Sequence, residues 1–415
     1  NSDGSLDLTF DTNGVVTTDV SATIQSDTAN AVVLQADGQI VVAGRAGIGS
    51  SHDFALVRYN TDGSLDPSLD IDGVVTTDFP GSRVDIGKDV AVQVDGKIVV
   101  VGSSRSLSGS SGLVLLRYDR HGALDPAFGL DGFVTTQLGF AVTNAVTLQS
   151  DGKILVAGES AVGSDYDFAL ARFLPDGSLD TDFGDAGKVI IDFGGDQDAA
   201  DDTPRNQDQT VVAVGDDRAF EVIVQPDGRI VVVGSAYQYT LVSDVNSTTQ
   251  IPVPVQGNFA VVRLDSDGTL DEGFGTGGML KTSFDGILPE LGGGATGVVL
   301  QADGKIVVIG TTLSDEDAVF DFAVARYLSD GTLDDSFDGD GKVITDFGMP
   351  GDQRVDEAAG VVIQDDGRII VAGSSKYGFR SDFALVGYRD DGSLDPTFGN
   401  GGKVTSSFGD GTSSN

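Results

Sequence analysis

The segment Val92-Gln93-Val94-Asp95-Gly96-Lys97-Ile98-Val99-Val100-Val101-Gly102 decides the fold. Two apolar runs rich in β-branched residues flank an Asp-Gly pair, which is typical of a β-hairpin. We expect a type I′ turn, which needs a positive φ at both central residues. The same hairpin recurs, with its aspartate at Asp37, Asp95, Asp151, Asp227, Asp303 and Asp366. The chain is therefore a repeat protein, and we call this hairpin with the strand that follows it the head of each repeat.

The third strand of each head is an apolar run such as Phe54–Tyr59, and a tail follows it. The tail has a turn, most often Asp-Gly-Ser-Leu-Asp, and a glycine-marked corner that leads into a fourth strand such as Gly73–Phe79. The β-branched content favours strands, and no window shows a sustained helical period. Four strands with closely spaced turns are typical of a propeller blade or a solenoid coil. A closed ring protects the sheet edges, so the predicted fold class is all-β, a β-propeller with six four-stranded blades.

The ends of the chain leave the number of blades open. We treat residues 1–415 as a single propeller whose head-containing repeats lie at approximately 30–79, 89–138, 144–193, 219–284, 296–347 and 358–408. A further tail without a head lies at residues 1–20, and we expect it to close the ring. The alternative is a seven-bladed ring with an incomplete blade at the chain ends.

Composition restricts the partners. The 415 residues carry a net charge of −39, from 64 acidic and 25 basic residues, and there is no Cys or Trp. Nucleic acid binding needs a Lys/Arg surface, so we expect no nucleic acid partner. No apolar run is long enough for a membrane helix, so we expect no membrane insertion. The first residue is Asn1 rather than Met, and we expect an extracellular or cell-surface protein after signal-peptide removal.

The repeat also carries a resemblance. Asp-Gly-Lys-Ile-Val-Val-x-Gly, Asp-Phe-Ala-Leu-x-Arg-Tyr and Asp-Gly-Ser-Leu-Asp-Pro-x-Phe-Gly recur along nearly the whole chain and resemble the delta-60 repeat family of bacterial β-propellers. The resemblance implies a secreted or surface-attached bacterial protein and implies no activity. Each recurring Arg is expected to pair with an Asp of its own or the adjacent blade. Gly387 departs from this pattern where other copies carry Arg, and Gly112 departs where they carry Asp.

Loop lengths distinguish two faces of the predicted ring. The turns within the hairpin and before the fourth strand are nearly constant, whereas the other loops vary, above all Gly194–Arg218 and Ser235–Gly257. Variable loops on a rigid scaffold commonly carry binding sites. The predicted partner-binding face comprises Asp196, Asp198, Asp201, Asp202, Tyr237, Tyr239, Asp315, Glu316, Asp317 and Tyr377.

Catalytic motifs are scarce. The two histidines, His52 and His121, have no recurring nucleophile beside them. Paired carboxylates for glycoside cleavage are compatible with so acidic a chain, but the aromatic platforms of sugar-binding propellers often use Trp, which is absent. We therefore expect no enzymatic activity and no catalytic residues.

Calcium is the one cofactor for which the sequence offers ligands, and none is required. Three tails place oxygen-bearing side chains at alternate positions, a spacing that suits a hard cation. The candidate metal ligands are Asp7, Asp11, Asn13, Asp66, Asp70, Asp72, Asp334, Asp338 and Asp340. Other tails replace the third acid with Gly, and Asp and Gly are also ordinary turn residues.

The leading functional hypothesis is a non-enzymatic secreted or cell-surface propeller, a structural or interaction module that binds a protein, glycan or extracellular matrix partner through its variable face. One alternative is a carbohydrate-binding, lectin-like or carbohydrate-active propeller. Another is a calcium-dependent adhesin or surface-layer component.

Overall fold

A computed structural model describes residues 1–21, 26–79, 82–106, 111–136, 139–162, 165–193, 216–243, 250–284, 293–313, 319–348, 353–378 and 380–407, although the side chains of 82–83, 106, 111, 162, 165, 238–243 and 250–256 are not described. In these residues all regular structure is β-strand. The strands are β1 (Thr28–Leu34), β2 (Ile40–Ile48), β3 (Ser51–Tyr59), β4 (Val74–Thr77), β5 (Ser82–Val92), β6 (Ile98–Ser106), β7 (Ser111–Tyr118), β8 (Phe133–Thr136), β9 (Phe140–Leu148), β10 (Ile154–Val162), β11 (Asp165–Phe173), β12 (Lys188–Ile191), β13 (Asp217–Val224), β14 (Ile230–Ser243), β15 (Gln250–Leu264), β16 (Met279–Thr282), β17 (Ala295–Leu300), β18 (Ile306–Leu313), β19 (Phe320–Tyr327), β20 (Lys342–Thr345), β21 (Val355–Ile363), β22 (Ile369–Tyr377), β23 (Arg380–Tyr388) and β24 (Lys403–Ser406).

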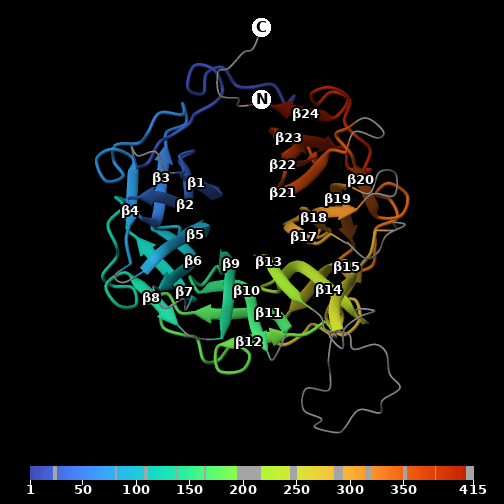
Figure 1. The fold of residues 1–415 in the computed structure, drawn as a ribbon, viewed down its shortest axis with the longest axis horizontal. Coiled ribbons are helices and arrows are strands. Elements are labelled where there is room, and N and C mark those ends of the chain that lie inside the picture. Colours follow the sequence, from blue (N-terminus) through green and yellow to red (C-terminus); the bar gives the residue numbers. More distant parts are fainter. Residues whose placement is uncertain are drawn as a thin grey trace.

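The strands form antiparallel meanders of four, arranged around a ring with the first strand of each innermost (Figure 1). We number these blades 1 to 6, from β1–β4 to β21–β24, and call the strands of each a, b, c and d. One parallel bridge between His52 and Val84 joins the first two blades into a continuous sheet. The prediction of an all-β propeller is confirmed. No helix among the described residues has the length and hydropathy needed to cross a bilayer.

The recurring hairpin differs from its predicted turn type. The Gly96 amide donates to the Gln93 carbonyl at 2.9 Å, and the turn residues between them are Val94 and Asp95. Gly96 has a φ of 83°, whereas Asp95 keeps a negative φ. The turn is therefore a type I turn followed by a left-handed glycine, not the type I′ turn expected from the Asp-Gly pair. This longer loop leaves Val94 at the tip, fully exposed.

The core lies between blades. Five clusters of buried apolar side chains join the consecutive pairs of blades from 1–2 to 5–6. In most of them a strand-c Phe meets the Phe that follows strand d at an edge-to-face angle, as Phe322 and Phe347 do with ring centroids 5.0 Å apart. Burial of these apolar faces is the main stabilising contribution to the ring.

Buried ion pairs reinforce the same junctions. The strand-c arginine pairs with the tail aspartate of its own blade, as predicted, in Arg58–Asp66, Arg117–Asp125, Arg172–Asp180, Arg263–Asp271 and Arg326–Asp334. Nη1 of each arginine also donates to a carbonyl of the next blade's c–d turn, such as Asp390 O from Arg326 at 2.6 Å. Each arginine thus connects two blades.

Residues 1–20 form a further tail between blades 6 and 1. The Gly399 amide donates to Asp3 O at 2.7 Å, and the Asp11 amide donates to Asp62 O at 2.8 Å. The same tail-to-turn hydrogen bond links each of the remaining neighbouring pairs of blades; for example, the Asp70 amide donates to His121 O. Among the described residues β24 is the strand paired with β23, so residues 1–20 connect the two blades without adding a strand to the last sheet.

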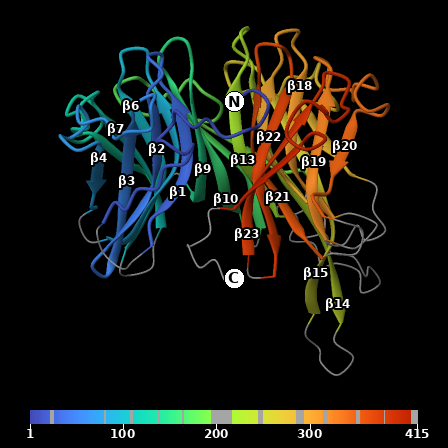
Figure 2. The ribbon, with the colours of Figure 1, turned by 90° about the horizontal axis from the view of Figure 1, so that it is seen from above.

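The β14–β15 hairpin extends beyond the other strands at the face opposite the N-terminus (Figure 2). This is the face of the b–c and d–a loops. Loop Gly194–Arg218 lies outside the described residues apart from its last three positions.

Candidate functional site

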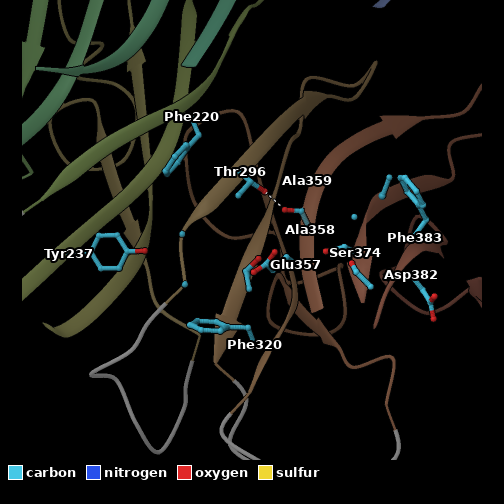
Figure 3. A pocket seen from close by; sticks show the side chains of 16 residues that line it. Phe220, Tyr237, Thr296, Phe320, Glu357, Ala358, Ala359, Ser374, Asp382 and Phe383 are labelled. Atoms are coloured by element: carbon cyan, nitrogen blue, oxygen red, sulfur yellow. Dashed lines mark hydrogen bonds between the residues drawn. The ribbon is translucent and has the colours of Figure 1, made fainter. Parts of the chain in front are cut away.

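The candidate site is a pocket of about 650 Å³ where blades 4, 5 and 6 meet (Figure 3). Its aromatic side chains are Phe220 on β13, Tyr237 on β14, Phe320 on β19 and Phe383 on β23. Polar groups come from the first strand of blade 5 and from blade 6: Thr296, Glu357, Ser374, Ser381 and Asp382. The pocket therefore combines several aromatic rings with carboxylates and hydroxyls.

Strand geometry places these groups together. Phe220 lies seven residues before Asp227 of the hairpin turn. At the equivalent position the innermost strands of the other blades carry Asn30, Lys88, Asn144, Thr296 and Ala359. Phe320 and Asp382 lie at the beginning of their c strands, so both are at the loop end of the blade. Thr296 Oγ1 donates to Ala358 O at 2.8 Å, which holds β17 against β21 at the pocket wall.

Both pocket carboxylates have cationic neighbours on their own blade. Lys376 Nζ contacts Glu357 Oε2 at 2.5 Å, and Arg380 Nε contacts Asp382 Oδ1 at 3.0 Å. These pairs are exposed or half-exposed, so they orient the carboxylates more than they stabilise the fold. The Tyr237 ring is partly buried, and this burial raises the pKa of its hydroxyl. The hydroxyl therefore stays protonated near neutral pH.

The predicted binding face is only partly described. Tyr237 lines the pocket, whereas Tyr377 lies at the end of β22, 56% exposed, with the Arg354 guanidinium 5.8 Å from its ring centroid. The other predicted residues fall outside the described residues or side chains: Asp196, Asp198, Asp201, Asp202, Tyr239, Asp315, Glu316 and Asp317. Sequence analysis missed Phe220, Phe320, Glu357 and Asp382. The one feature of the sequence that could have indicated this pocket was the large apolar side chain of Phe220, at a position where the other blades carry polar or small residues.

The predicted calcium ligands act as turn residues in this structure. Asp66 Oδ2 accepts hydrogen bonds from Arg58 and Ser68, and Asp334 is engaged in the same way by Arg326 and Ser336. Asp7 accepts from Thr9, and Asn13, Asp72 and Asp340 each accept the amide two residues ahead. Asp11, Asp70 and Asp338 have positive φ values. Calcium binding by these tails stays a prediction.

Clusters of three carboxylates occur elsewhere, at the junctions of strands c and d with the next strand a. They are Asp53–Asp78–Asp85, Asp167–Asp192–Asp217 and Asp321–Asp346–Asp356, with potential ligand oxygens within 4.8 Å of one another. The third member of each accepts the amide of the Phe after strand d, as Asp217 does from Phe193 at 2.7 Å. Burial, with smaller contributions from Asp192 and Asp167, raises the pKa of Asp217 to about 7. The cluster can therefore hold a proton or a cation.

The repeat pattern identifies the family. The model of the family described as "Domain of unknown function (DUF5122) beta-propeller" matches residues 35–69, 93–128, 149–183, 225–247, 255–274, 301–337 and 364–398, together more than half of the chain. The chain belongs to this family. The expected resemblance to a family of repeat propellers of unknown function is confirmed. No curated protein gives a significant match.

Similar solved structures include carbohydrate-active enzymes. A polysaccharide lyase of family PL25, an ulvan lyase, has a TM-score of 0.48 and 13% identity, with 90% of this chain and 82% of that chain covered. The α-L-arabinofuranosidase Arb93A from Fusarium graminearum has a TM-score of 0.44 and 11% identity, covering 86% and 92%. The endo-arabinase from Bacteroides thetaiotaomicron has a TM-score of 0.33 and 10% identity, covering 78% and 93%.

These comparisons correct the expectation of a non-enzymatic structural or interaction module, because the similar structures act on glycans. In the sequence, the absence of Trp is one reason to expect no activity on sugars. In the structure Phe220, Tyr237 and Phe320 supply aromatic surface from three strands, so a sugar-binding pocket does not require Trp. At such low identity the likeness concerns the fold, and activity has to be argued from this chain's own residues.

Proposed function

We propose that this protein is an extracellular or cell-surface carbohydrate-active propeller whose pocket between blades 4, 5 and 6 binds a short stretch of a glycan. The observation that carries the proposal is the meeting of Phe220, Tyr237 and Phe320 with Glu357 and Asp382 in one pocket. Sugar rings pack their apolar faces on aromatic side chains, while carboxylates and hydroxyls accept and donate hydrogen bonds to sugar hydroxyls. The pocket volume of about 650 Å³ accommodates an oligosaccharide of a few residues.

The charge of the chain favours a neutral glycan. A net charge of −39 repels polyanions such as uronate-rich or sulfated polymers at low salt. Within the pocket the carboxylates of Glu357 and Asp382 are the groups available for proton transfer at a glycosidic bond, since cleavage by most glycoside hydrolases uses two such residues. An extracellular location belongs to the same proposal, because polymeric glycans lie outside the cell.

The proposal is tested first by binding. We expect the intact chain to retain neutral oligosaccharides on a glycan array, and Tyr237→Ala and Phe320→Ala each to weaken binding of the best ligand at least about tenfold. Tyr377→Ala is the matched control, because this exposed tyrosine lies outside the pocket lining and its loss leaves binding unchanged. Absence of any glycan ligand, or equal binding by all three variants, would refute the proposal.

A further inference from the structure

The described ring has five apolar junctions between blades, and none of them joins blade 6 to blade 1. Between those two blades the described contacts are made through residues 1–20, on the face of the constant turns. In Figure 1 the N-terminal segment runs between the blue first blade and the red last blade. The sheets on either side of this position therefore keep faces that every other blade buries.

Blade 1 exposes the face that would pack on a preceding blade. Val32 on β1 lies five residues before the hairpin aspartate and is 66% exposed. Its counterparts Val90, Val146, Val222 and Val298 are at most 7% exposed. Leu34, on the same face of β1, is 68% exposed. Their counterparts in the other blades pack into the junction with the preceding blade, which explains why these residues are apolar.

Blade 6 exposes the opposite face, which would pack on a following blade. Phe383 in strand c is 62% exposed, whereas its counterparts Phe54, Phe168, Phe259 and Phe322 are at most 2% exposed. Val362 on β21 points to the same side and is 59% exposed. The two exposed faces are thus the two halves of a junction that the other blades make with one another.

One position that recurs in every repeat, the glycine of strand b, lies at the junction with the preceding blade. A Cβ placed on Gly102, Gly234, Gly310 or Gly373 would meet a backbone carbonyl oxygen in or just before strand a at 1.9–2.1 Å and the strand-c Phe of the preceding blade at 2.7–2.9 Å. Both the neighbouring strand and the aromatic ring therefore require glycine at these positions. Gly44 is the counterpart in blade 1, and the three atoms nearest to its added Cβ all belong to Thr28 and Ala29. The strand-b glycine Gly44 and the strand-c Phe383 therefore occupy the two positions that meet one another in four of the five described junctions.

Residues 1–20 already form the tail of the repeat at this position. Asn1 Nδ2 donates to Ser5 Oγ and Leu6 O, just as Asn60 Nδ2 donates to Ser64 Oγ and Leu65 O. Thr18 Oγ1 lies 2.6 Å from Tyr59 Oη, and Thr77 makes the same contact with Tyr118 at 2.8 Å. What the position lacks is a head, the strands a, b and c.

We propose that the space between blades 6 and 1 is the seat of a seventh head of the same repeat, whose strands a, b and c complete a seventh blade with residues 1–20 as its tail. In every other repeat strand c leads directly into the turn that Asn1–Asp7 forms here. The head would place an aromatic ring against Gly44 and a glycine against Phe383. Its strand-c arginine would reach Asp7, the counterpart of Asp66, which Thr9 engages in the present structure. This inference shares Phe383 with the lining of the candidate pocket, whereas Val32, Leu34 and Val362 lie outside that lining.

The test adds the missing head. A copy of residues 28–59, which carries Gly44, Phe54, Arg58 and a tight hairpin, is fused directly ahead of Asn1. We expect the melting temperature to rise by about 5 °C or more, because both exposed faces become buried. Since the chain has no Cys, Val362→Cys gives a unique thiol, and its alkylation should slow at least about tenfold in the fusion.

Two controls make the result decisive. In the first, the copied segment carries Asp in place of the valine that corresponds to Val32, which would face blade 6, and we expect no protection of the thiol at position 362. In the second, Leu130→Cys reports on an exposed site in the tail of blade 2 and should be alkylated equally with or without the added head. Fast alkylation at position 362 in the fusion, with an unchanged melting temperature, would overturn the proposal. So would a stable dimer of the unfused chain that protects position 362, since a second copy would then occupy the space.

Discussion

Arg368 in the hairpin turn of blade 6 contacts the tail aspartate Asp395, with Nη1 lying 3.3 Å from Oδ2. In blades 2 to 5 the tail aspartate contacts both the equivalent hairpin cation, such as Lys97, and a strand-c arginine, whereas in blade 6 the strand-c position is Gly387. Arg368 Nη1 also donates to Ser2 O at 2.9 Å, which is the c–d turn carbonyl equivalent to Asp390 O in the preceding junction. With no arginine at position 387, Arg368 alone among the described residues provides both the close ion pair with Asp395 and the hydrogen bond to the next turn.

Restoring a side chain at position 387 should destabilise the protein. A Cβ on Gly387 would lie 2.8 Å from Cγ of Phe398, a buried ring that cannot move aside without repacking. We expect Gly387→Ala to lower the melting temperature, whereas Gly360→Ala on β21, where an added Cβ meets nothing within 4 Å, leaves it nearly unchanged. Thermal unfolding followed by circular dichroism measures both, and equal melting temperatures for the two variants would show that Phe398 yields.

Removing one partner of a buried pair should have a large effect. Arg326 is 1% exposed, pairs with Asp334 at 2.8 Å and lies with its guanidinium 4.7 Å from the Phe337 centroid. Arg326→Ala leaves the Asp334 carboxylate buried beside an unfilled space, and we expect a loss of about 3 kcal/mol in the free energy of unfolding. Arg389→Ala, at an exposed arginine 3.8 Å from Asp395, should change it little. Urea titration separates the two outcomes, and similar midpoints would contradict the structural role of the pair.

The carboxylate cluster of blades 3 and 4 should make stability depend on pH. The pKa of Asp217 is about 7 in the folded protein against 3.8 as the ordinary value, because burial disfavours its charge. The stabilisation from the bound proton is fully present below about pH 4 and is lost as pH rises through 7. Asp217→Asn keeps an oxygen acceptor for the Phe193 amide and should raise the melting temperature at pH 8 but not at pH 4.

The control for this pH scan has the opposite sign. Hydrogen bonds from the Ser64 hydroxyl and amide lower the pKa of Asp62, so its carboxylate stabilises the fold above about pH 4, and Asp62→Asn should lose stability at pH 7. The scan is repeated with a chelator, because a cation bound among Asp167, Asp192 and Asp217 would keep all three ionised. A melting temperature of Asp217→Asn that tracks the parent at every pH would contradict the raised pKa.

The pocket carboxylates should separate turnover from binding. If Glu357 and Asp382 transfer protons at a glycosidic bond, Glu357→Gln and Asp382→Asn will lower the rate of reducing-sugar release about a hundredfold or more on the neutral polysaccharide that binds. Binding of the same glycan should change only a few-fold, because each amide keeps an oxygen acceptor. Glu272→Gln, at an exposed tail position outside the pocket, serves as the matched control. Unchanged release by both pocket variants would assign the pocket to binding alone.

The sequence by itself determined the repeat, its strands and the pairing of each strand-c arginine with an aspartate. These features are encoded locally: alternating β-branched residues specify strands, Asp-Gly pairs specify turns, and Arg58 and Asp66 lie close in the chain. Even so, the negative φ of Asp95 shows that the turn type needed the backbone itself.

Only the tertiary structure decided the site. Phe220, Phe320 and Asp382 come from three blades, and Asp167, Asp192 and Asp217 come from two, so no spacing along the chain reveals their meeting. The hydrogen bond from Arg368 to Ser2 and the exposed junction at Val32 and Phe383 are likewise properties of the ring. The physical reason is that local sequence fixes backbone conformation, whereas contacts between blades depend on how each sheet packs against the next.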